Sequence, residues 1–283
     1  MFGEDDHTDQ LSPFVASKIT LIERHADAYL EVLAAPGSSS EQDNLDQLDR
    51  RVERVLAEYD PPSTRRAGDS LVFAHVYALI DDIPEHPPAA DHPLRVLAMA
   101  MLAAEIEARG PLRLSRRQNR MLALIYEDLG ARLLDVGLPA HACVAFRQAR
   151  DLHAINADLD DQDRCGLALA RARTRAQRRG IRRAPGFIAN ILCGYGYRPF
   201  RLLGWIACEL ALFAGALMLV TDVAATTATH LSLIEFLNPL GLGDLDAMGL
   251  EPTARVLLIV ESYLGSVTTS VFFALLVRRW FRL

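Results

Sequence analysis

Along the first part of the chain, apolar residues recur at alternating spacings of three and four, which places them on one face of an α-helix. Within residues 9–35 the positions that follow this spacing are Ile19, Ile22, Ala26, Tyr29 and Leu33. The same spacing predicts further helices over 45–59, 70–83 and 94–109, separated by segments rich in proline, glycine and serine. No stretch of this half alternates between apolar and polar residues as a β-strand does, so the sequence predicts an all-α fold.

The segment from Tyr126 to Ile155 carries a denser pattern of aromatic and small residues, YEDLGARLLDVGLPAHACVAFRQARDLHAI. It resembles one tetratricopeptide (TPR) repeat, in which two antiparallel helices approach closely through small residues such as Gly130 and Ala142, with Phe146 beside them. The positions that match the repeat pattern are Tyr126, Leu129, Gly130, Gly137, Ala142, Phe146 and Ala149. One unit cannot bury its own apolar face, and at least about three are normally needed. Either the preceding helices are divergent repeats, which gives a TPR-like domain, or the region is an ordinary helical bundle.

Two long apolar runs follow in the last third of the chain, Leu202–Val220 and Val256–Val277, and each contains one charged residue, Glu209 or Glu261. Each run is close to the about 20 residues with which a helix crosses the hydrocarbon core of a bilayer. Arginines precede the first run and follow the second, whereas the segment between them is acidic. Because positive residues favour the cytoplasmic side, we expect a multi-pass protein of the cell (plasma or inner) membrane with both termini in the cytoplasm.

The segment between the two runs begins with a stretch, Thr229–Pro239, that is too apolar for a solvated connection and too short to cross a bilayer. At about 1.5 Å per residue it reaches only halfway, which predicts a re-entrant helix. The LGLGD sequence that follows contains Gly241 and Gly243, and glycine adopts dihedral angles that other residues avoid. An irregular backbone at this depth is tolerated only where it is buried in protein or lines water. The carbonyl groups of this loop are therefore predicted to line an ion pathway.

In this order of elements, the part from Leu202 to the carboxyl terminus resembles the two-transmembrane pore-loop channels of the potassium-channel superfamily. Their filter reads Thr-Val-Gly-Tyr-Gly-Asp, and the aligned residues here are Pro239, Leu240, Gly241, Leu242, Gly243 and Asp244. The resemblance implies a homotetramer in which carbonyl groups replace the hydration shell of a monovalent cation. It also implies filter support from Glu235 and a gating hinge at Gly265. Glu261 is expected to support the filter as well, because a carboxylate within a span usually faces protein or water. Pro239 replaces the threonine of the innermost ion site, which leaves potassium selectivity open.

The stretch Arg164–Arg183 is rich in arginine and contains no acidic residue. Its position before the first apolar run predicts a juxtamembrane segment that binds anionic membrane lipid. The arginines assigned to the membrane surface are Arg178, Arg179, Arg182 and Arg183. The residues that follow, up to 200, are amphipathic and aromatic, which favours a helix or turn at the membrane interface. The predicted division is 1–163 for a cytoplasmic helical domain, 164–200 for a linker with an interfacial helix, and 201–283 for the channel domain.

Composition and charge exclude several other function classes. The net charge of -6 and the lack of interleaved basic and aromatic residues argue against nucleic-acid binding. The cysteines lack paired spacing, so we expect reduced thiols at Cys143, Cys165, Cys193 and Cys208. The acidic run at 158–163 lacks the glycine and the closing glutamate of a calcium loop, and we interpret it as a solvated helix connection.

No metal-ligand spacing, nucleophile or phosphate-binding loop emerges, so we expect neither an enzyme nor a bound metal or cofactor. The sequence therefore predicts a tetrameric cation channel, with potassium as one candidate ion, regulated by its cytoplasmic helical domain through a protein or small-molecule ligand. Two alternatives stay open. One is a membrane-anchored, TPR-like adaptor or signalling protein without conduction, and the other is a pore-loop relative that assembles but no longer conducts.

Overall fold

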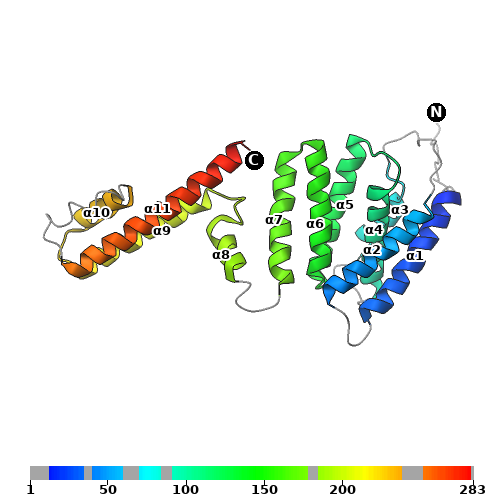
Figure 1. Cartoon of the computed structure of the whole chain (residues 1–283), viewed down its shortest axis with the longest axis horizontal. Coiled ribbons are helices and arrows are strands. Elements are labelled where there is room, and N and C mark those ends of the chain that lie inside the picture. The colour runs from blue at the N-terminus through cyan, green and yellow to red at the C-terminus, as the bar shows by residue number, and fades with distance from the viewer. Residues whose placement is uncertain are drawn as a thin grey trace, which may run out of the picture. The chain divides into compact units, whose positions relative to one another are not determined.

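The structure, a computed structural model, describes residues 13–34, 40–59, 70–83, 91–177, 184–237 and 251–281, with the backbone alone for residues 91 and 92. Of these residues 85% are helical and none lies in a strand. The predicted all-α fold class is therefore confirmed. The chain divides into two units, Met1–Arg179 and Gly180–Leu283, whose helices are drawn in Figure 1. We refer to them as unit 1 and unit 2.

Unit 1 contains seven helices within the described ranges. They are α1 (Pro13–Ala34), α2 (Glu41–Ala57), α3 (Ala74–Asp81), α4 (Asp91–Arg109), α5 (Arg116–Asp135), α6 (Pro139–Asn156) and α7 (Leu159–Ala176). Each segment for which the apolar spacing predicts a helix is helical. Sequence signals also mark where two of them begin, because Ser40 with Asp43 and Ser115 with Gln118 form capping boxes at the amino ends of α2 and α5.

Helix α4 lies at the centre of unit 1. The residues from Met99 to Ala104 are each at most 2% exposed, and α1, α2, α3 and α5 all pack against this helix. A helix that is apolar on every side is buried on every side. The short side chains of Ala100, Ala103 and Ala104 let the surrounding helices approach α4 closely.

Two carboxylates on α4 are also buried, and both are supplied with hydrogen-bond donors. Glu105 accepts from the Tyr126 hydroxyl at 3.0 Å and from the Gln148 amide at 3.2 Å. Glu107 accepts from the Tyr77 hydroxyl at 2.9 Å and from a backbone N–H just before α3. Burial of a carboxylate without such donors would reduce the stability of the fold by an amount on the order of several kcal/mol. These bonds therefore hold α3, α5 and α6 against α4.

Helices α5, α6 and α7 lie side by side, as Figure 1 shows. Helix α5 ends at a turn in which Gly137 has φ +83°, a left-handed conformation that glycine adopts at little cost. Across the helix pair, a Cβ added at Gly130 would lie only 2.7 Å from a ring atom of Phe146. The close contact predicted from the TPR resemblance is thus present. The assignment of the other helices to a repeat array stays a prediction.

The acidic run at 158–163 is not the solvated connection that we expected. Asp158 stands at the N-cap position of α7, and Asp160 and Asp161 lie in its first turn. Negative side chains stabilise a helix there because the amino end carries a partial positive charge. The arginine-rich stretch consequently begins inside a packed helix, since Cys165 and Leu169 of α7 are buried in the core of unit 1.

Unit 2 consists of α8 (Ala184–Cys193), α9 (Arg201–Val220), α10 (Ala225–Leu237) and α11 (Pro252–Phe281) within its described residues. Helices α9 and α11 run alongside each other, and α10 packs against both (Figure 1). Both α9 and the 252–280 part of α11 are long and apolar enough to cross a membrane. Both predicted spans are therefore helical, and a shorter helix lies between them in the chain.

We expect Gly130→Ala to destabilise the α5–α6 pair. The new methyl group would overlap the Phe146 ring, and overpacking costs about 1–3 kcal/mol, which outweighs the about 1 kcal/mol that alanine gains over glycine in a helix. Hydrogen exchange of α5 and α6 amides in the full chain measures the loss. The matched control is the same substitution in a Phe146→Leu background, where the smaller side chain should remove most of the penalty. Equal exchange in wild type and Gly130→Ala would contradict the contact.

Candidate functional site

The residues that the sequence assigns to the filter, Pro239–Asp244, lie outside the described residues, as do Arg178, Arg179, Arg182 and Arg183. The remaining predicted site residues are described: Glu235 on α10, and Glu261 and Gly265 on α11. The structure brings these three together, because α10 packs against α11 next to the start of the filter segment. We therefore treat the α9–α10–α11 contact region as the candidate site.

Small and apolar residues form one part of this contact region. Leu217, Ala228, Ala254 and Leu258 form a buried cluster that joins the three helices. Ala228 and Ala254 are fully buried, and their short side chains allow the helix backbones to come close. Small residues at helix contacts are typical of membrane helices, where packing replaces the hydrophobic effect as the force between helices.

The same contact region contains three carboxyl groups, one from each helix. Glu235 of α10 is 4% exposed, Glu261 of α11 is fully buried, and Glu209 of α9 is partly buried. Glu261 interacts electrostatically with both of the others. The Thr268 hydroxyl of α11 donates a hydrogen bond of 3.2 Å to Glu209, which fixes α9 against α11. The candidate site therefore contains three neighbouring carboxyl groups.

Glu261 differs from the buried carboxylates of unit 1. The Ser232 hydroxyl of α10 faces Glu261 and interacts with it, but the pair lies outside good hydrogen-bond geometry within the described residues. A carboxyl group placed inside a membrane helix costs roughly 2.5–3.5 kcal/mol and usually faces protein or water. Glu261 therefore has acceptor capacity left for a donor at the end of α10.

Gly265 has a packing role that the sequence did not indicate. A Cβ at this position would lie 2.5 Å from Phe236 Cδ2 and 2.8 Å from Phe236 Cε2. The Phe236 ring of α10 therefore packs directly against the backbone of α11 at Gly265. The hinge assigned to Gly265 stays a prediction, and α11 continues as a helix through this residue.

Phe236, Ser232 and Thr268 are site residues that the sequence reasoning missed. A signal for part of the set was available, because the residues of α11 that face its neighbours recur at helical spacing. These residues are Ala254, Leu258, Glu261, Gly265 and Thr268. Small and polar residues on one face of an otherwise apolar helix indicate a contact with other helices. Their partners on α10 depend on how the chain folds back, which the spacing does not specify.

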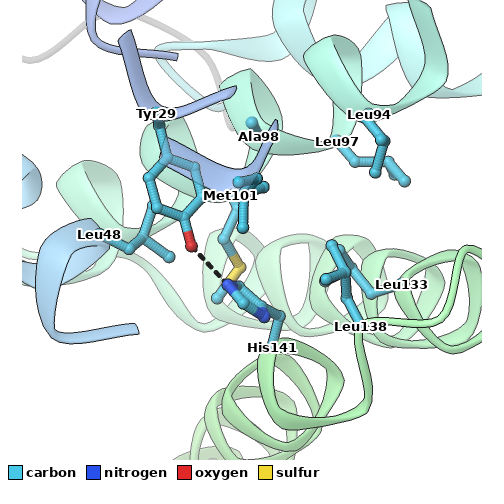
Figure 2. Close-up of a pocket in the computed structure, with 10 residues that line it drawn as sticks. Tyr29, Leu48, Leu94, Leu97, Ala98, Met101, Leu133, Leu138 and His141 are labelled. Atoms are coloured by element: carbon cyan, nitrogen blue, oxygen red, sulfur yellow. Dashed lines mark hydrogen bonds between the residues drawn. The ribbon is translucent and has the colours of Figure 1, made fainter. Parts of the chain in front are cut away.

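Unit 1 contains a second polar group beside a pocket, shown in Figure 2. The Tyr29 hydroxyl lies 2.5 Å from His141 Nε2, and His141 Nδ1 lies 3.3 Å from Glu41. The remaining wall is apolar, formed by residues such as Leu97 and Met101. The cavity measures about 10 Å³, no more than one water molecule requires. The group therefore links α1, α2 and α6 as part of the core and leaves no room for a substrate.

Comparison with known proteins adds no assignment, because no protein-family model, curated protein or solved structure matches the chain.

We expect Gly265→Ala to destabilise unit 2, because the added methyl group would enter the Phe236 ring. Gly215→Ala in α9 is the matched control, since a Cβ there meets nothing within 4 Å. The control should be neutral or stabilising by up to about 1 kcal/mol, and Gly265→Ala should cost about 1–3 kcal/mol. The chain's two tryptophans, Trp205 and Trp280, both lie in unit 2, so thermal unfolding followed by tryptophan fluorescence in detergent reports on this unit.

The double variant Phe236→Ala with Gly265→Ala separates packing from helix propensity. With the ring removed, the alanine at 265 should stabilise α11 as it stabilises α9 at 215. If Gly265→Ala and Gly215→Ala changed the stability of unit 2 equally in the presence of Phe236, the packing of the Phe236 ring against Gly265 would be contradicted.

Proposed function

We propose that the chain is one subunit of a tetrameric pore-loop cation channel, with unit 2 as the membrane part and unit 1 as its regulatory domain. The observation that carries the proposal is the placement of α10. This short apolar helix packs on both span-length helices and ends at Leu237, directly before the predicted filter Pro239–Asp244. A pore helix that leads into a carbonyl-lined filter requires this order of elements.

The exposure of α9 and α11 supports a membrane location. Only 17% and 22% of their apolar windows are buried within the chain, whereas the core helix of a soluble domain is covered. Leu212 and Leu219 of α9 are 70% and 89% exposed, and Val267 of α11 is 61% exposed. Lipid and neighbouring subunits are the environments that cover such a surface.

The length and direction of α10 suit a pore helix. Its 13 residues extend about 20 Å, less than the about 30 Å of the hydrocarbon core. Its carboxyl end, which carries a partial negative charge, is the end that precedes the filter. In a tetramer, four such ends would point at one axis and favour a cation there.

The carboxylates at the end of α10 have a structural part in this proposal. Residues 238–250 must connect α10 to α11, and their backbone N–H groups need acceptors wherever water is excluded. Glu261 is fully buried and meets the Ser232 hydroxyl without a well-formed hydrogen bond, and Glu235 lies beside it. We assign these two residues to holding the filter loop.

Aromatic residues just before α9 and basic residues at the end of α11 support the predicted orientation in the membrane. Arg278 lies over the Tyr197 ring and Arg279 over the Phe200 ring, at 5.2 and 5.3 Å from the ring centroids. These contacts join the start of α9 to the end of α11. Basic residues mark the cytoplasmic side, and aromatic residues gather at membrane interfaces. Both termini are therefore proposed to lie in the cytoplasm.

Unit 1 supplies a stack of helices, α5 to α7, whose chain leads into the membrane part. We propose that a protein or small-molecule ligand bound to unit 1 shifts a closed–open equilibrium of unit 2. The helix stack equally supports the second candidate, an adaptor that unit 2 anchors in the membrane. Pro239 in place of the filter threonine favours keeping this candidate in the test.

Ion flux from liposomes containing the purified chain, under a potassium and then a sodium gradient, tests the proposal. We expect flux of at least one of these cations, and a fall of about tenfold or more in Gly241→Val or Gly243→Val, because valine avoids the backbone dihedrals that glycine supplies to a filter. Gly249→Val is the matched control, since it makes the same change in the same loop outside the GLGD motif. The control should retain most of the flux.

The mass of the detergent-solubilised protein, measured by native mass spectrometry, should be that of four 31.3 kDa chains. A tetramer without flux of either cation would identify a relative that assembles but does not conduct. A monomer without flux would favour the adaptor, and in both cases the channel proposal would be wrong.

A further inference from the structure

The turn between α6 and α7 brings a buried histidine to two aspartates. His153 of α6 is fully buried. Its Nδ1 atom lies 4.0 Å from a carboxylate oxygen of Asp158 and 4.0 Å from one of Asp161. These three atoms all lie within 4.8 Å of one another. Nδ1 has no hydrogen-bond partner among the described residues.

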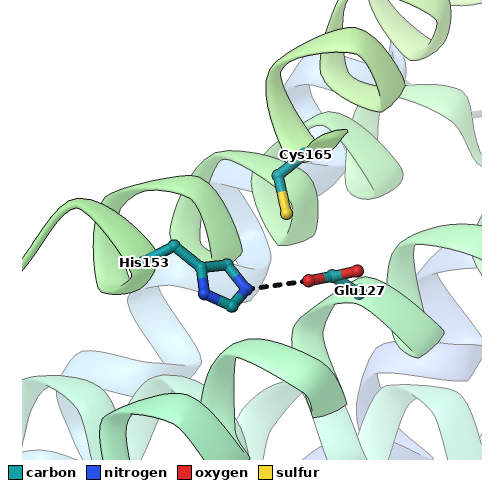
Figure 3. A group of neighbouring side chains, drawn as sticks. All are labelled: Glu127, His153 and Cys165. Atoms are coloured by element: carbon teal, nitrogen blue, oxygen red, sulfur yellow. Dashed lines mark hydrogen bonds and ion pairs between the residues drawn. The ribbon is translucent and has the colours of Figure 1, made fainter. Parts of the chain in front are cut away.

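The opposite ring nitrogen of His153 is already occupied. Nε2 lies 2.8 Å from Glu127 Oε1, as Figure 3 shows. Since the Glu127 carboxylate accepts a hydrogen bond from Nε2–H, a neutral imidazole carries its lone pair on Nδ1. A histidine that ligates a metal generally donates its other N–H to a carboxylate in this way, which fixes the ring and its tautomer.

A lone pair on Nδ1 that faces two carboxylates is electrostatically unfavourable unless a positive charge lies between them. At 4.0 Å neither aspartate forms a hydrogen bond with Nδ1, and a metal ion, unlike a single proton, can contact the nitrogen and both carboxylates at once. A metal ion about 2.0–2.2 Å from each atom holds nitrogen and oxygen ligands roughly 3.4 Å apart. Rotation of the Asp158 and Asp161 side chains would bring their oxygens from 4.0 Å to this separation from Nδ1.

The cluster on the Nε2 side does not suit an ion. Cys165 is 1% exposed, and burial raises the pKa of its thiol to about 12, so an ion on this side would have to displace the thiol proton. Arg164 donates to both oxygens of Glu127 at 2.9 Å and supplies a positive charge there. Arg164 also bonds Asp161 through Oδ1 at 2.5 Å, which leaves Oδ2 of Asp161 directed at His153.

We propose that His153, Asp158 and Asp161 bind one divalent transition-metal ion of the zinc class, with Glu127 as the residue that positions His153. One nitrogen and two oxygen ligands suit Zn²⁺ and leave a fourth position for water. The aspartate side chains are 35% and 23% exposed, so an ion reaches the site from solvent. The ion would tie the end of α6 to the first turn of α7 and thereby stabilise unit 1.

Calorimetric titration of Zn²⁺ into the full chain in detergent, without an affinity tag and after treatment with EDTA, tests the site. We expect one tight Zn²⁺ per chain, bound at least about tenfold more weakly in Asp158→Asn and in Asp161→Asn because each loses a ligand. Asp163→Asn is the matched control, since Asp163 is exposed on the same helix and the charge change is identical. Glu127→Gln should weaken binding about 10–100-fold, the usual effect of removing a carboxylate behind a ligating histidine.

Cys165→Ala and the absorption spectrum of the Co²⁺-loaded chain separate the two sides of His153. We expect unchanged affinity in Cys165→Ala and a Co²⁺ spectrum without a thiolate charge-transfer band. Loss of binding in Cys165→Ala would place the ion at Nε2 and overturn the assignment. Absence of tight binding to the wild type, or equal affinity in the Asp158→Asn, Asp161→Asn and Asp163→Asn variants, would overturn it as well. None of these measurements depends on ion flux.

Discussion

The requirement that a buried carboxylate must find a hydrogen-bond donor organises both units of this chain. In unit 1 the donors come from within, since Tyr126 and Tyr77 bring their hydroxyls to Glu105 and Glu107 and so join α4 to its neighbours. Glu261 in unit 2 is buried as deeply, yet in the described helices it meets the Ser232 hydroxyl without a well-formed hydrogen bond to either oxygen. The same chemistry gives a closed core in one unit and an open acceptor in the other. The contrast adds to the placement of α10, which carries the proposed function.

Much of the fold could be predicted from the sequence because each helix carries its own signal. The apolar face of α1 repeats at helical spacing, the capping residue Ser115 precedes α5, and the runs that form α9 and α11 are apolar over the length of a membrane span. These signals are local, so each helix can be predicted without knowing which other helices pack against it. The contact between Gly130 and Phe146 could also be predicted, because the repeat pattern that it belongs to lies within one pair of adjacent helices.

The parts of the site that could not be predicted depend on contacts between helices far apart in the chain. His153 lies 26 positions from Glu127, and the two meet only because α5 and α6 pack as an antiparallel pair. Asp161 carries no spacing signal of a ligand, since its relation to His153 is created by the turn at the end of α6. The acidic run was misinterpreted for a related reason. Its charge indicates solvent when taken alone, whereas beside α6 it starts a helix and faces a buried imidazole.

The packing of Phe236 on Gly265 constrains how the proposed channel opens. A glycine within a membrane helix permits bending, but a bend of α11 at Gly265 would move the backbone on which the Phe236 ring rests. The ring belongs to α10, and Leu237, the next residue, ends that helix just before the filter segment. In the proposed channel, a bend at Gly265 would therefore also move the Phe236 ring and the end of α10 that carries it. Glu261 lies one turn before Gly265 on the same face of α11, so the same bend would also change its contact with Ser232. A bend at a glycine without such contacts would leave α10 in place, whereas here the two helices would respond together.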